Sequence, residues 1–192
     1  MRNQAYAERT HEKMQEVLMV PSAVGPSIHY HMIRGGRSKR NITVWEPGTV
    51  GGEYIKAYGH YHITNFVETY KVLEGEGLLL LQMRKKDASQ KFIDEEIASF
   101  EAIKVKAGDV LVIPAFAGHA MVNTGKTWLV TSDDSPVNFD EGDSASMPQH
   151  ADYEPFRKMH GFAYYAIEKD GNVEFIKNAN YKSVPPITKR ST

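Results

Sequence analysis

The chain has no cysteine among its 192 residues, which excludes disulfides and zinc sites that rely on thiolate ligands. Any metal would therefore be held by histidine, carboxylate or water. The chain also lacks a basic excess, because 23 Lys and Arg stand against 24 Asp and Glu, for a formal net charge of −1. Since nucleic acids and anionic membranes normally bind basic proteins, we expect neither as a partner.

Long apolar runs are missing as well. No stretch approaches the roughly 20 apolar residues that a membrane-spanning helix needs, and residues 1–9 contain no apolar segment of the signal-peptide kind. Together with the absence of cysteine, these features lead us to expect a cytoplasmic protein. A length of 192 residues is enough for one domain with a substantial core.

We expect residues 1–27 to form an N-terminal arm that contains one short helix. Apolar residues recur with helical spacing between Ala5 and Met19, and Pro21 should end the helix. The main domain is expected over residues 28–180. Residues 181–192 contain two adjacent prolines and are expected to form a tail.

Most of the remaining chain has the pattern of short strands, with β-branched and aromatic runs separated by turns that contain glycine. The expected strands are 42–45, 69–73, 77–83, 100–105, 110–113, 121–122, 128–131, 164–167 and 173–176. No helical pattern lies between them, which disfavours a parallel α/β sheet. The sequence therefore predicts an all-β barrel or jelly roll.

Three connecting segments carry separate expectations. The stretch from Glu74 to Gly77 has the composition of a hairpin turn between its flanking strands. The polar stretch from Lys85 to Ser99 is expected to be an extended loop or a short helix. Ser132 to His150 is rich in Asp, Ser and Gly, and we expect a long mobile segment near the mouth of the barrel, of the kind that serves as a lid.

Three histidines and one glutamate form the most informative pattern in the chain. His60 and His62 are two residues apart, so both side chains leave the same face of a strand. Glu68 begins the next apolar run, and His119 follows the strand expected at 110–113. Three imidazoles and a carboxylate suit Fe(II), Mn(II), Ni(II) or Zn(II). The spacing predicts a metal held across neighbouring strands inside a β-barrel.

These residues follow the two sequence motifs of the cupins. The first motif comprises His60-x-His62, Glu68 and Gly75. The second comprises Gly108, Pro114, His119 and Asn123. Phe116 replaces the glycine that is common two residues after the proline, a departure that touches no metal ligand. The resemblance implies a cupin jelly-roll barrel.

Among cupins, the chain is most similar to the metal-dependent phosphoglucose isomerases of the cupin type, which are typical of archaea. The similarity covers about residues 42–162 and rests above all on Gly59-His60-Tyr61-His62 with Leu80-Leu81-Gln82 downstream. It implies reversible interconversion of glucose 6-phosphate and fructose 6-phosphate, in glycolysis and gluconeogenesis. It also implies a homodimer and one divalent metal, with Fe(II) as the first candidate and Mn, Ni or Zn as alternatives.

The resemblance also assigns roles to individual residues. The implied metal ligands are His60, His62, Glu68 and His119, with Glu68 catalytic as well. The implied substrate-binding residues are Thr43 and Gly59 for the phosphate, and Tyr70, His150 and Tyr153 for the sugar.

Two departures from the family pattern concern the substrate. Ala57-Tyr58 stands where the family usually has Thr-Lys, so one phosphate-binding hydroxyl is missing. His150 lies one place earlier than the family's histidine. A different sugar phosphate therefore remains an alternative.

Aldose–ketose isomerisation moves hydrogen between C1 and C2, either as a proton by way of an enediol or as a hydride. Both routes build negative charge on sugar oxygens, which a divalent cation stabilises. Four protein ligands leave two octahedral positions for a sugar that binds through two oxygens. Glu68 could then be both ligand and proton shuttle, although metal binding makes a carboxylate a weaker base.

Several alternatives stay open from the sequence alone. The same ligand set could serve a metal-dependent oxygenase, and a non-catalytic sugar-binding cupin is a third function. His29 and His31 share the spacing of the ligand pair, but no glutamate follows them at a suitable distance, so we expect an ordinary strand surface there. Lys56 is expected on a solvated strand face. Glu53 either organises a turn or supports a ligand histidine.

Overall fold

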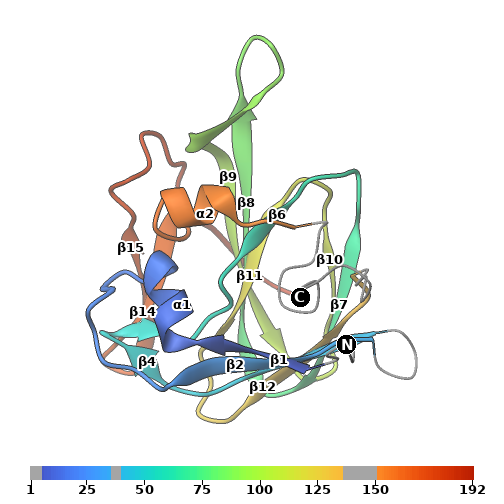
Figure 1. Cartoon of the computed structure of the whole chain (residues 1–192), viewed down its shortest axis with the longest axis vertical. Coiled ribbons are helices and arrows are strands. Elements are labelled where there is room, and N and C mark those ends of the chain that lie inside the picture. Colours follow the sequence, from blue (N-terminus) through green and yellow to red (C-terminus); the bar gives the residue numbers. More distant parts are fainter. Residues whose placement is uncertain (1–5, 36–39, 136–150) are drawn as a thin grey trace, which may run out of the picture.

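Two six-stranded sheets form the body of the protein in a computed structural model that describes residues 6–35, 40–135 and 151–192 (Figure 1). The first sheet has the order β1 (Tyr6–Thr10), β2 (Ile28–Ile33), β3 (Asn41–Trp45), β12 (Leu129–Asp133), β7 (Glu68–Glu74) and β10 (Val110–Ile113). The second has the order β13 (Ala151–Asp152), β6 (His60–His62), β11 (Gly118–Asn123), β8 (Glu76–Lys86), β9 (Phe92–Lys106) and β16 (Thr188–Ser191).

A smaller third sheet and two short helices complete the described residues. The third sheet has the order β15 (Asn172–Lys177), β14 (Tyr164–Lys169), β5 (Glu53–Tyr54) and β4 (Thr49–Val50). The helices are α1 (His11–Met14), continued by a 3₁₀ turn at Gln15–Val17, and α2 (Glu154–Lys158). The protein is therefore mostly β and confirms the prediction of an all-β cupin jelly roll, although no ladder between described strands joins the two large sheets into a closed barrel.

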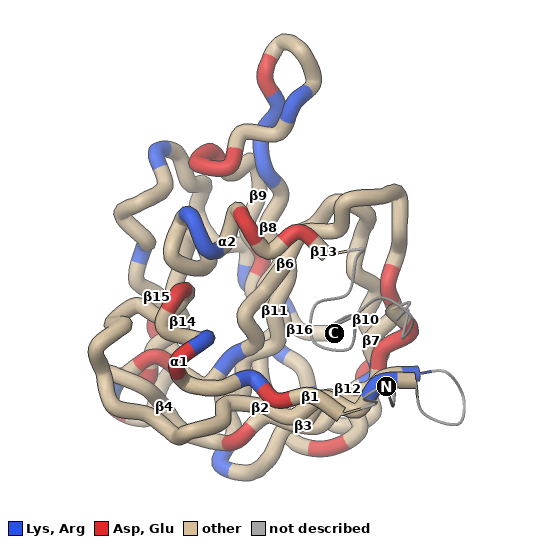
Figure 2. Tube along the Cα trace, viewed as in Figure 1, with Lys and Arg blue, Asp and Glu red and all other residues tan. Residues whose placement is uncertain are grey.

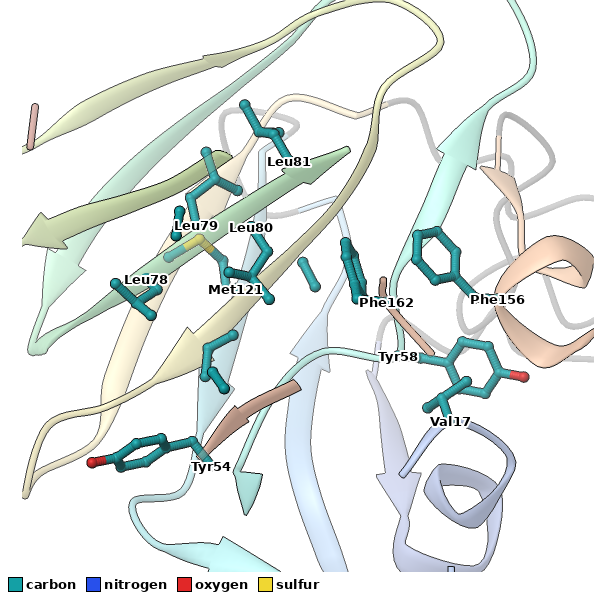
Figure 3. Packing of buried hydrophobic residues seen from close by; sticks show 14 of the residues in the cluster. Val17, Tyr54, Tyr58, Leu78, Leu79, Leu80, Leu81, Met121, Phe156 and Phe162 are labelled. Atoms are coloured by element: carbon teal, nitrogen blue, oxygen red, sulfur yellow. The ribbon is translucent and has the colours of Figure 1, made fainter. Parts of the chain in front are cut away.

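The core lies between the large sheets and under the smaller one. Leu78–Leu81 of β8 are all buried, and Figure 3 shows them packed with Met121 of β11 near Phe162. Both faces of β8 are thus covered, which explains a continuous apolar run where a half-exposed strand would alternate. Strands β6 and β11 carry no Lys, Arg, Asp or Glu and stay tan in Figure 2. The residue types of these central strands indicate that they face the interior.

The N-terminal segment differs from the prediction. Only residues 11–17 are helical, whereas Tyr6–Thr10 form β1, which pairs antiparallel with β2. The oxygen of the Thr10 side chain accepts a hydrogen bond from the Lys13 amide, which caps the helix at that point. Pairing with the open edge of β2 supplies interstrand hydrogen bonds, and this tertiary gain overrides the weak helical pattern.

The predicted hairpin at Glu74–Gly77 is wrong. β7 and β8 follow each other in sequence but belong to different sheets, so the chain crosses from one layer to the other at Gly75. Gly75 has φ +82°, and a Cβ there would lie 2.4 Å from the carbonyl oxygen of Trp128. The glycine signal is therefore real, but it marks a corner between sheets.

The expectation of a loop or helix at Lys85–Ser99 is also wrong. β8 and β9 continue as a long hairpin whose tip projects from the body, and charges of both signs gather near this end (Figures 1 and 2). Arg84 forms an ion pair with Asp94 at 2.6 Å and lies over the rings of Tyr61 and Phe92. These cross-strand contacts stabilise a hairpin that the polar composition conceals.

The division into arm, main domain and tail stays a prediction, although both ends of the chain contribute strands. β1 adds to the edge of the first sheet, and β16, in the expected tail, pairs parallel with β9. The expected lid from Ser132 to His150 lies largely outside the described residues, apart from the end of β12 and the two residues that follow it. Among the described residues, no helix is both long and apolar enough to cross a membrane.

Candidate metal centre

The two sheets bring the four predicted ligands together. His60 and His62 lie on β6, and His119 lies on the neighbouring strand β11, where it pairs directly with His60. Glu68 is the first residue of β7 in the opposite sheet. The site therefore bridges two layers, with three imidazoles supplied by one sheet and the carboxylate by the other.

The geometry of the cluster suits a single ion. One ligand atom from each of the four residues can be chosen so that all lie within 4.8 Å of one another. Oε2 of Glu68 lies 3.1 Å from Nε2 of His62 and 3.2 Å from Nε2 of His119. His62, Glu68 and His119 are each at most 2% exposed, whereas His60 is partly open to the cavity described below. Three of the four residues are buried and the fourth is partly exposed, so the cluster can hold an ion and still be reached by a ligand.

The hydrogen bond on the far side of His62 indicates what its near side offers. Nδ1 of His62 lies 3.1 Å from the carbonyl oxygen of Phe66, so this nitrogen carries the proton and donates it. Nε2 then presents a lone pair toward the Glu68 carboxylate. When the ring is neutral, this lone pair and the carboxylate oxygen of Glu68, 3.1 Å apart, could bind one cation together. The residues present therefore fit a divalent metal.

The electrostatics of the cluster favour an ionised carboxylate. Burial alone would raise the pKa of Glu68, but in the metal-free protein hydrogen bonds from His119 and His62, together with the charges of His119 and His60, hold it well below its usual range. Burial raises the pKa of Tyr70 well above its ordinary value and that of Tyr153 to about 12. At neutral pH the site therefore combines one carboxylate with two neutral phenols that can donate hydrogen bonds.

A cavity of about 510 Å³, counting its open mouth, adjoins the cluster. His60, Glu68 and His119 form part of its wall. Four of the predicted substrate-binding residues also line it, namely Thr43, Gly59, Tyr70 and Tyr153. The fifth, His150, lies outside the described residues. Their common cavity is consistent with the predicted roles, which stay predictions.

Gly59 is required by its surroundings. Its φ is +83°, and a Cβ at this position would lie 2.4 Å from Cε2 of Phe162. The chain can therefore turn into β6 beside the core only where no side chain is present. Phe162 in turn packs on Phe156 of α2, with ring centroids 4.3 Å apart (Figure 3). The glycine before His60 thus fixes the approach of the ligand strand.

Sequence reasoning missed several polar residues of the cavity wall. These are Arg9, Tyr30, Arg34, Asp133 and Ser135. Arg9 was missed because residues 6–10 were expected to be helical. In the strand that they form, Arg9 lies on the inward face with Ala7. A signal for Arg34 exists in the alternation of β2, where Tyr30 and Met32 are buried and Arg34 continues the same face.

The prediction of a solvated Lys56 is wrong. Lys56 is 3% exposed, and its Nζ donates to Glu53 Oε1 at 2.5 Å and to the carbonyl oxygen of Val17 at 2.6 Å. The other oxygen of Glu53 accepts from the Met19 amide at 2.7 Å. Glu53 therefore supports no ligand histidine. The buried pair fastens the N-terminal turn to the β5 region, because burial of one charge requires the other.

His29 also differs from the expected strand surface. It is fully buried, and its Nε2 lies 3.0 Å from Nδ1 of His11. Burial, followed by the charges of His11 and Lys56, lowers the pKa of His29 to about 4. His31, two residues on, faces outward and lies 2.7 Å from the Tyr6 hydroxyl. No second histidine–carboxylate cluster occurs among the described residues.

The jelly roll and its cluster of three histidines and one glutamate define a cupin with a candidate metal centre. The sequence model of the family described as "Glucose-6-phosphate isomerase (GPI)" matches residues 3–183, and the chain belongs to this family. Similar proteins include the glucose-6-phosphate isomerases of Pyrococcus abyssi and Pyrococcus horikoshii, each 31% identical over 144 residues. The matched region covers 73% of this chain and 63% of each relative's length.

Solved structures resemble the chain more distantly. A protein from Thermotoga maritima, described as a predicted oxalate decarboxylase, is 20% identical, with a TM-score of 0.36 over 54% of this chain and 76% of that chain. The chain spans less than two thirds of the length of the glucose-6-phosphate isomerases that it matches.

Proposed function

We propose that the chain is a metal-dependent aldose–ketose isomerase that interconverts glucose 6-phosphate and fructose 6-phosphate. One observation carries the proposal. Three of the four cluster residues, His60, Glu68 and His119, line the same cavity as four residues expected to bind substrate. Family membership supports the reaction class, since the relatives are named glucose-6-phosphate isomerase. The substrate of this chain is inferred from both.

His60, His62, Glu68 and His119 would hold the metal, and a bound divalent cation supplies Lewis-acid stabilisation for charge on the two sugar oxygens. The protein's part is to orient the sugar and to exclude water. His62 is kept in the ligating tautomer by the Phe66 carbonyl, so the ligand set is preorganised before substrate arrives. The site gains precision from the rigid sheet that carries three of the four ligands.

Glu68 is the group best placed to move a proton between C1 and C2. It is ionised and at the wall of the cavity, and it is held by two histidines through one oxygen, Oε2. Its other oxygen, Oε1, is then the candidate proton acceptor. A hydride route would leave Glu68 as a ligand only, and the two routes differ in whether solvent hydrogen enters the product at C1 or C2.

Tyr70 and Tyr153 would position the sugar. The Tyr70 hydroxyl lies 3.5 Å from Nε2 of His119, at the edge of the metal cluster. The Tyr153 ring lies 5.3 Å from the ring of His60, measured between centroids. Both phenols stay protonated at neutral pH and can donate to hydroxyl or carbonyl oxygens near the cluster.

A coupled assay of fructose 6-phosphate turnover tests the proposal. The purified protein is assayed as isolated, after chelation, and after reloading with Fe(II), Mn(II), Ni(II) or Zn(II) separately, with mannose 6-phosphate as the comparison substrate. We expect activity that chelation abolishes and metal restores, with glucose 6-phosphate as product. Turnover that is insensitive to thorough chelation would contradict the metal role. Oxygen consumption in the iron-loaded protein, or sugar binding without turnover under every metal, would favour an oxygenase or a binding cupin.

Finer aspects of the proposal rest on the family likeness. These are Fe(II) as the resident metal, a homodimer and a place in glycolysis and gluconeogenesis; a cytoplasmic location is proposed from the composition of the chain. The reloading series tests the metal, and light scattering during size-exclusion chromatography tests the dimer. The ligand set itself accepts several borderline divalent ions.

A further inference from the structure

The N-terminal strand delivers an arginine into the cavity beside the metal centre. Along β1, Ala7 and Arg9 are turned inward, whereas Tyr6 and Glu8 are exposed. Arg9 is 5% exposed and lines the cavity wall. The planar, permanently charged guanidinium matches the geometry of a phosphate group better than any other side chain. Its place in the wall of this cavity therefore bears on which ligand the cavity accepts.

Tyr30 fixes where Arg9 lies. Nε of Arg9 donates to the Tyr30 hydroxyl at 3.1 Å, and the same hydroxyl accepts from the Tyr58 amide at 3.2 Å. The guanidinium carbon also lies 5.8 Å from the ring centroids of both tyrosines. Tyr30 thus fastens Arg9 to the chain just before β6.

Arg9 lies close to the segment Ala57-Tyr58, where this chain differs from the family pattern. Ala57 precedes Tyr58 directly, and both Ala57 and Gly59 line the cavity with Arg9. Ala57 occupies the position at which the family usually has a threonine whose hydroxyl binds the phosphate. Arg9 and the position of the missing hydroxyl therefore line the same cavity, and Tyr30 connects Arg9 to the residue after Ala57.

Arg34 supplies a second positive charge to this wall. It continues the inward face of β2, is 9% exposed and lines the cavity, with Nη2 3.0 Å from Sδ of Met32. Both arginines act on Tyr153, because their charges oppose the rise in its pKa that burial causes. Arg9 lies on β1 and Arg34 directly follows β2, and both line the same cavity as Tyr153.

The described acidic groups of the wall have partners of their own. Glu68 is engaged by His62 and His119. Asp133 accepts hydrogen bonds from Asn41 and Ser135; burial raises its pKa, and the charge of Arg34 opposes this rise. A divalent cation at the histidine cluster would add positive charge to the wall that carries the two arginines. A phosphate monoester carries roughly −1.5 to −2 charges at neutral pH.

We infer that Arg9, with Arg34 as a second cation, binds the phosphate group of the substrate beside Ala57 and takes over the role of the missing hydroxyl. The identity of the sugar rests on the proposed function, whereas phosphate binding can be measured without it. The resemblance to the family assigns phosphate contacts to Thr43 and Gly59 and gives no role to either arginine.

Titration calorimetry on chelator-treated protein tests the inference, with inorganic phosphate and fructose 6-phosphate as probes. Arg9→Gln keeps a donor for the Tyr30 hydroxyl but removes the charge, and Arg34→Met removes the second charge. We expect each to weaken phosphate binding by about tenfold to a hundredfold, the range for a hydrogen bond between charged partners. Arg190→Met is the matched control, because Arg190 is exposed on β16 and pairs with Glu101 at 2.9 Å.

Kinetics separate phosphate binding from a structural effect. In metal-loaded protein we expect Arg9→Gln to raise the KM for fructose 6-phosphate with little change in kcat, and Arg9→Lys to recover part of the loss. Salt should raise the wild-type KM and affect Arg9→Gln less, a difference that a packing role would not produce. If Arg9→Gln fails to fold, Arg34→Met and the salt dependence of the wild type decide.

The outcomes distinguish this inference from the proposed function. Phosphate binding that depends on Arg9, in a protein without isomerase activity, would support the inference and contradict the proposed function. Isomerase activity with wild-type KM and phosphate affinity in both Arg9→Gln and Arg34→Met would overturn the inference alone. Failure of the wild type to bind either probe would also overturn it.

Discussion

His62 and Glu68 meet through Nε2 and Oε2 at 3.1 Å, although they belong to different sheets. The Phe66 carbonyl, which holds the other nitrogen of His62, lies in the short connection between β6 and β7. This connection therefore leads from His62 in one sheet to Glu68 in the other, and its Phe66 carbonyl orients the His62 imidazole. A cation placed here would link the two sheets as well as the two side chains.

Removal of one ligand from the cluster should abolish metal retention. His119→Ala deletes an imidazole that lies 3.2 Å from Glu68, in a strand that is otherwise buried by apolar contacts. We expect metal affinity to fall by at least roughly 100-fold, with activity lost and the circular dichroism spectrum retained. Metal content after dialysis is the measurement. His31→Ala, on the outer face of the first sheet, should retain both metal and activity.

Restoring the missing hydroxyl should tighten substrate binding. Ala57 lines the cavity, so Ala57→Thr would add a donor in the cavity that Arg9 also lines. We expect the KM for fructose 6-phosphate to fall by about three- to tenfold, the value of one ordinary hydrogen bond. Ala57→Val is the matched control, since it has the same shape without the hydroxyl. Equal KM values for the two variants would place the phosphate elsewhere.

The buried pair of Lys56 and Glu53 should matter far more than a surface pair. Lys56→Met would leave the Glu53 carboxylate buried without its cation, which costs about 3–5 kcal/mol in the free energy of unfolding. Lys169→Met removes an exposed partner of Glu174 and should cost at most about 1 kcal/mol. Urea denaturation of the metal-free proteins measures both changes. Similar small losses would show that Lys56 is hydrated in solution.

His29 should make stability depend on pH in a defined window. Its pKa is about 4 in the folded protein, against an ordinary value of 6.5, because it is buried beside His11 and near Lys56. Between pH 6.5 and about pH 4, His29 is protonated in the unfolded chain but stays neutral in the folded protein. The contribution of His29 is therefore full above pH 6.5 and is lost as the pH falls toward 4, by up to about 3 kcal/mol.

Chemical denaturation at pH 7.5, 5.5 and 4.5 measures this dependence. We expect His29→Gln to lose less stability than the wild type over this range, whereas His31→Gln, on the outward face of the same strand, should follow the wild type. Parallel profiles for all three proteins would show that His29 is accessible to protons in the native state.

Local patterns predicted much of the strand content, and they failed where the partner of a segment is distant in sequence. The run at 110–113 is β10 as expected, because alternation and β-branched residues are local signals. Residues 6–10 have no such signal and become a strand only because β2 offers a free edge. The glycine at position 75 marks a turn in either case, and only the sheet order shows that the chain changes layers there.

For the candidate site, too, the sequence predicted some residues and missed others. Ligand spacing identified His60, His62, Glu68 and His119, since metal coordination restricts residue type and position together. Arg9 and Lys56 gave no comparable signal. A charged side chain on a strand is most often solvated, and its burial depends on what the rest of the chain places above it.

The sequence by itself determined that the chain would be a β structure with a histidine–carboxylate cluster, because strand periodicity and ligand spacing are properties of short segments. Only the tertiary structure decided that two arginines enter the same cavity and that a lysine and a glutamate are buried as a pair. These features arise from contacts between segments far apart in the chain, and the free energy of such contacts is set by burial, which no single segment specifies.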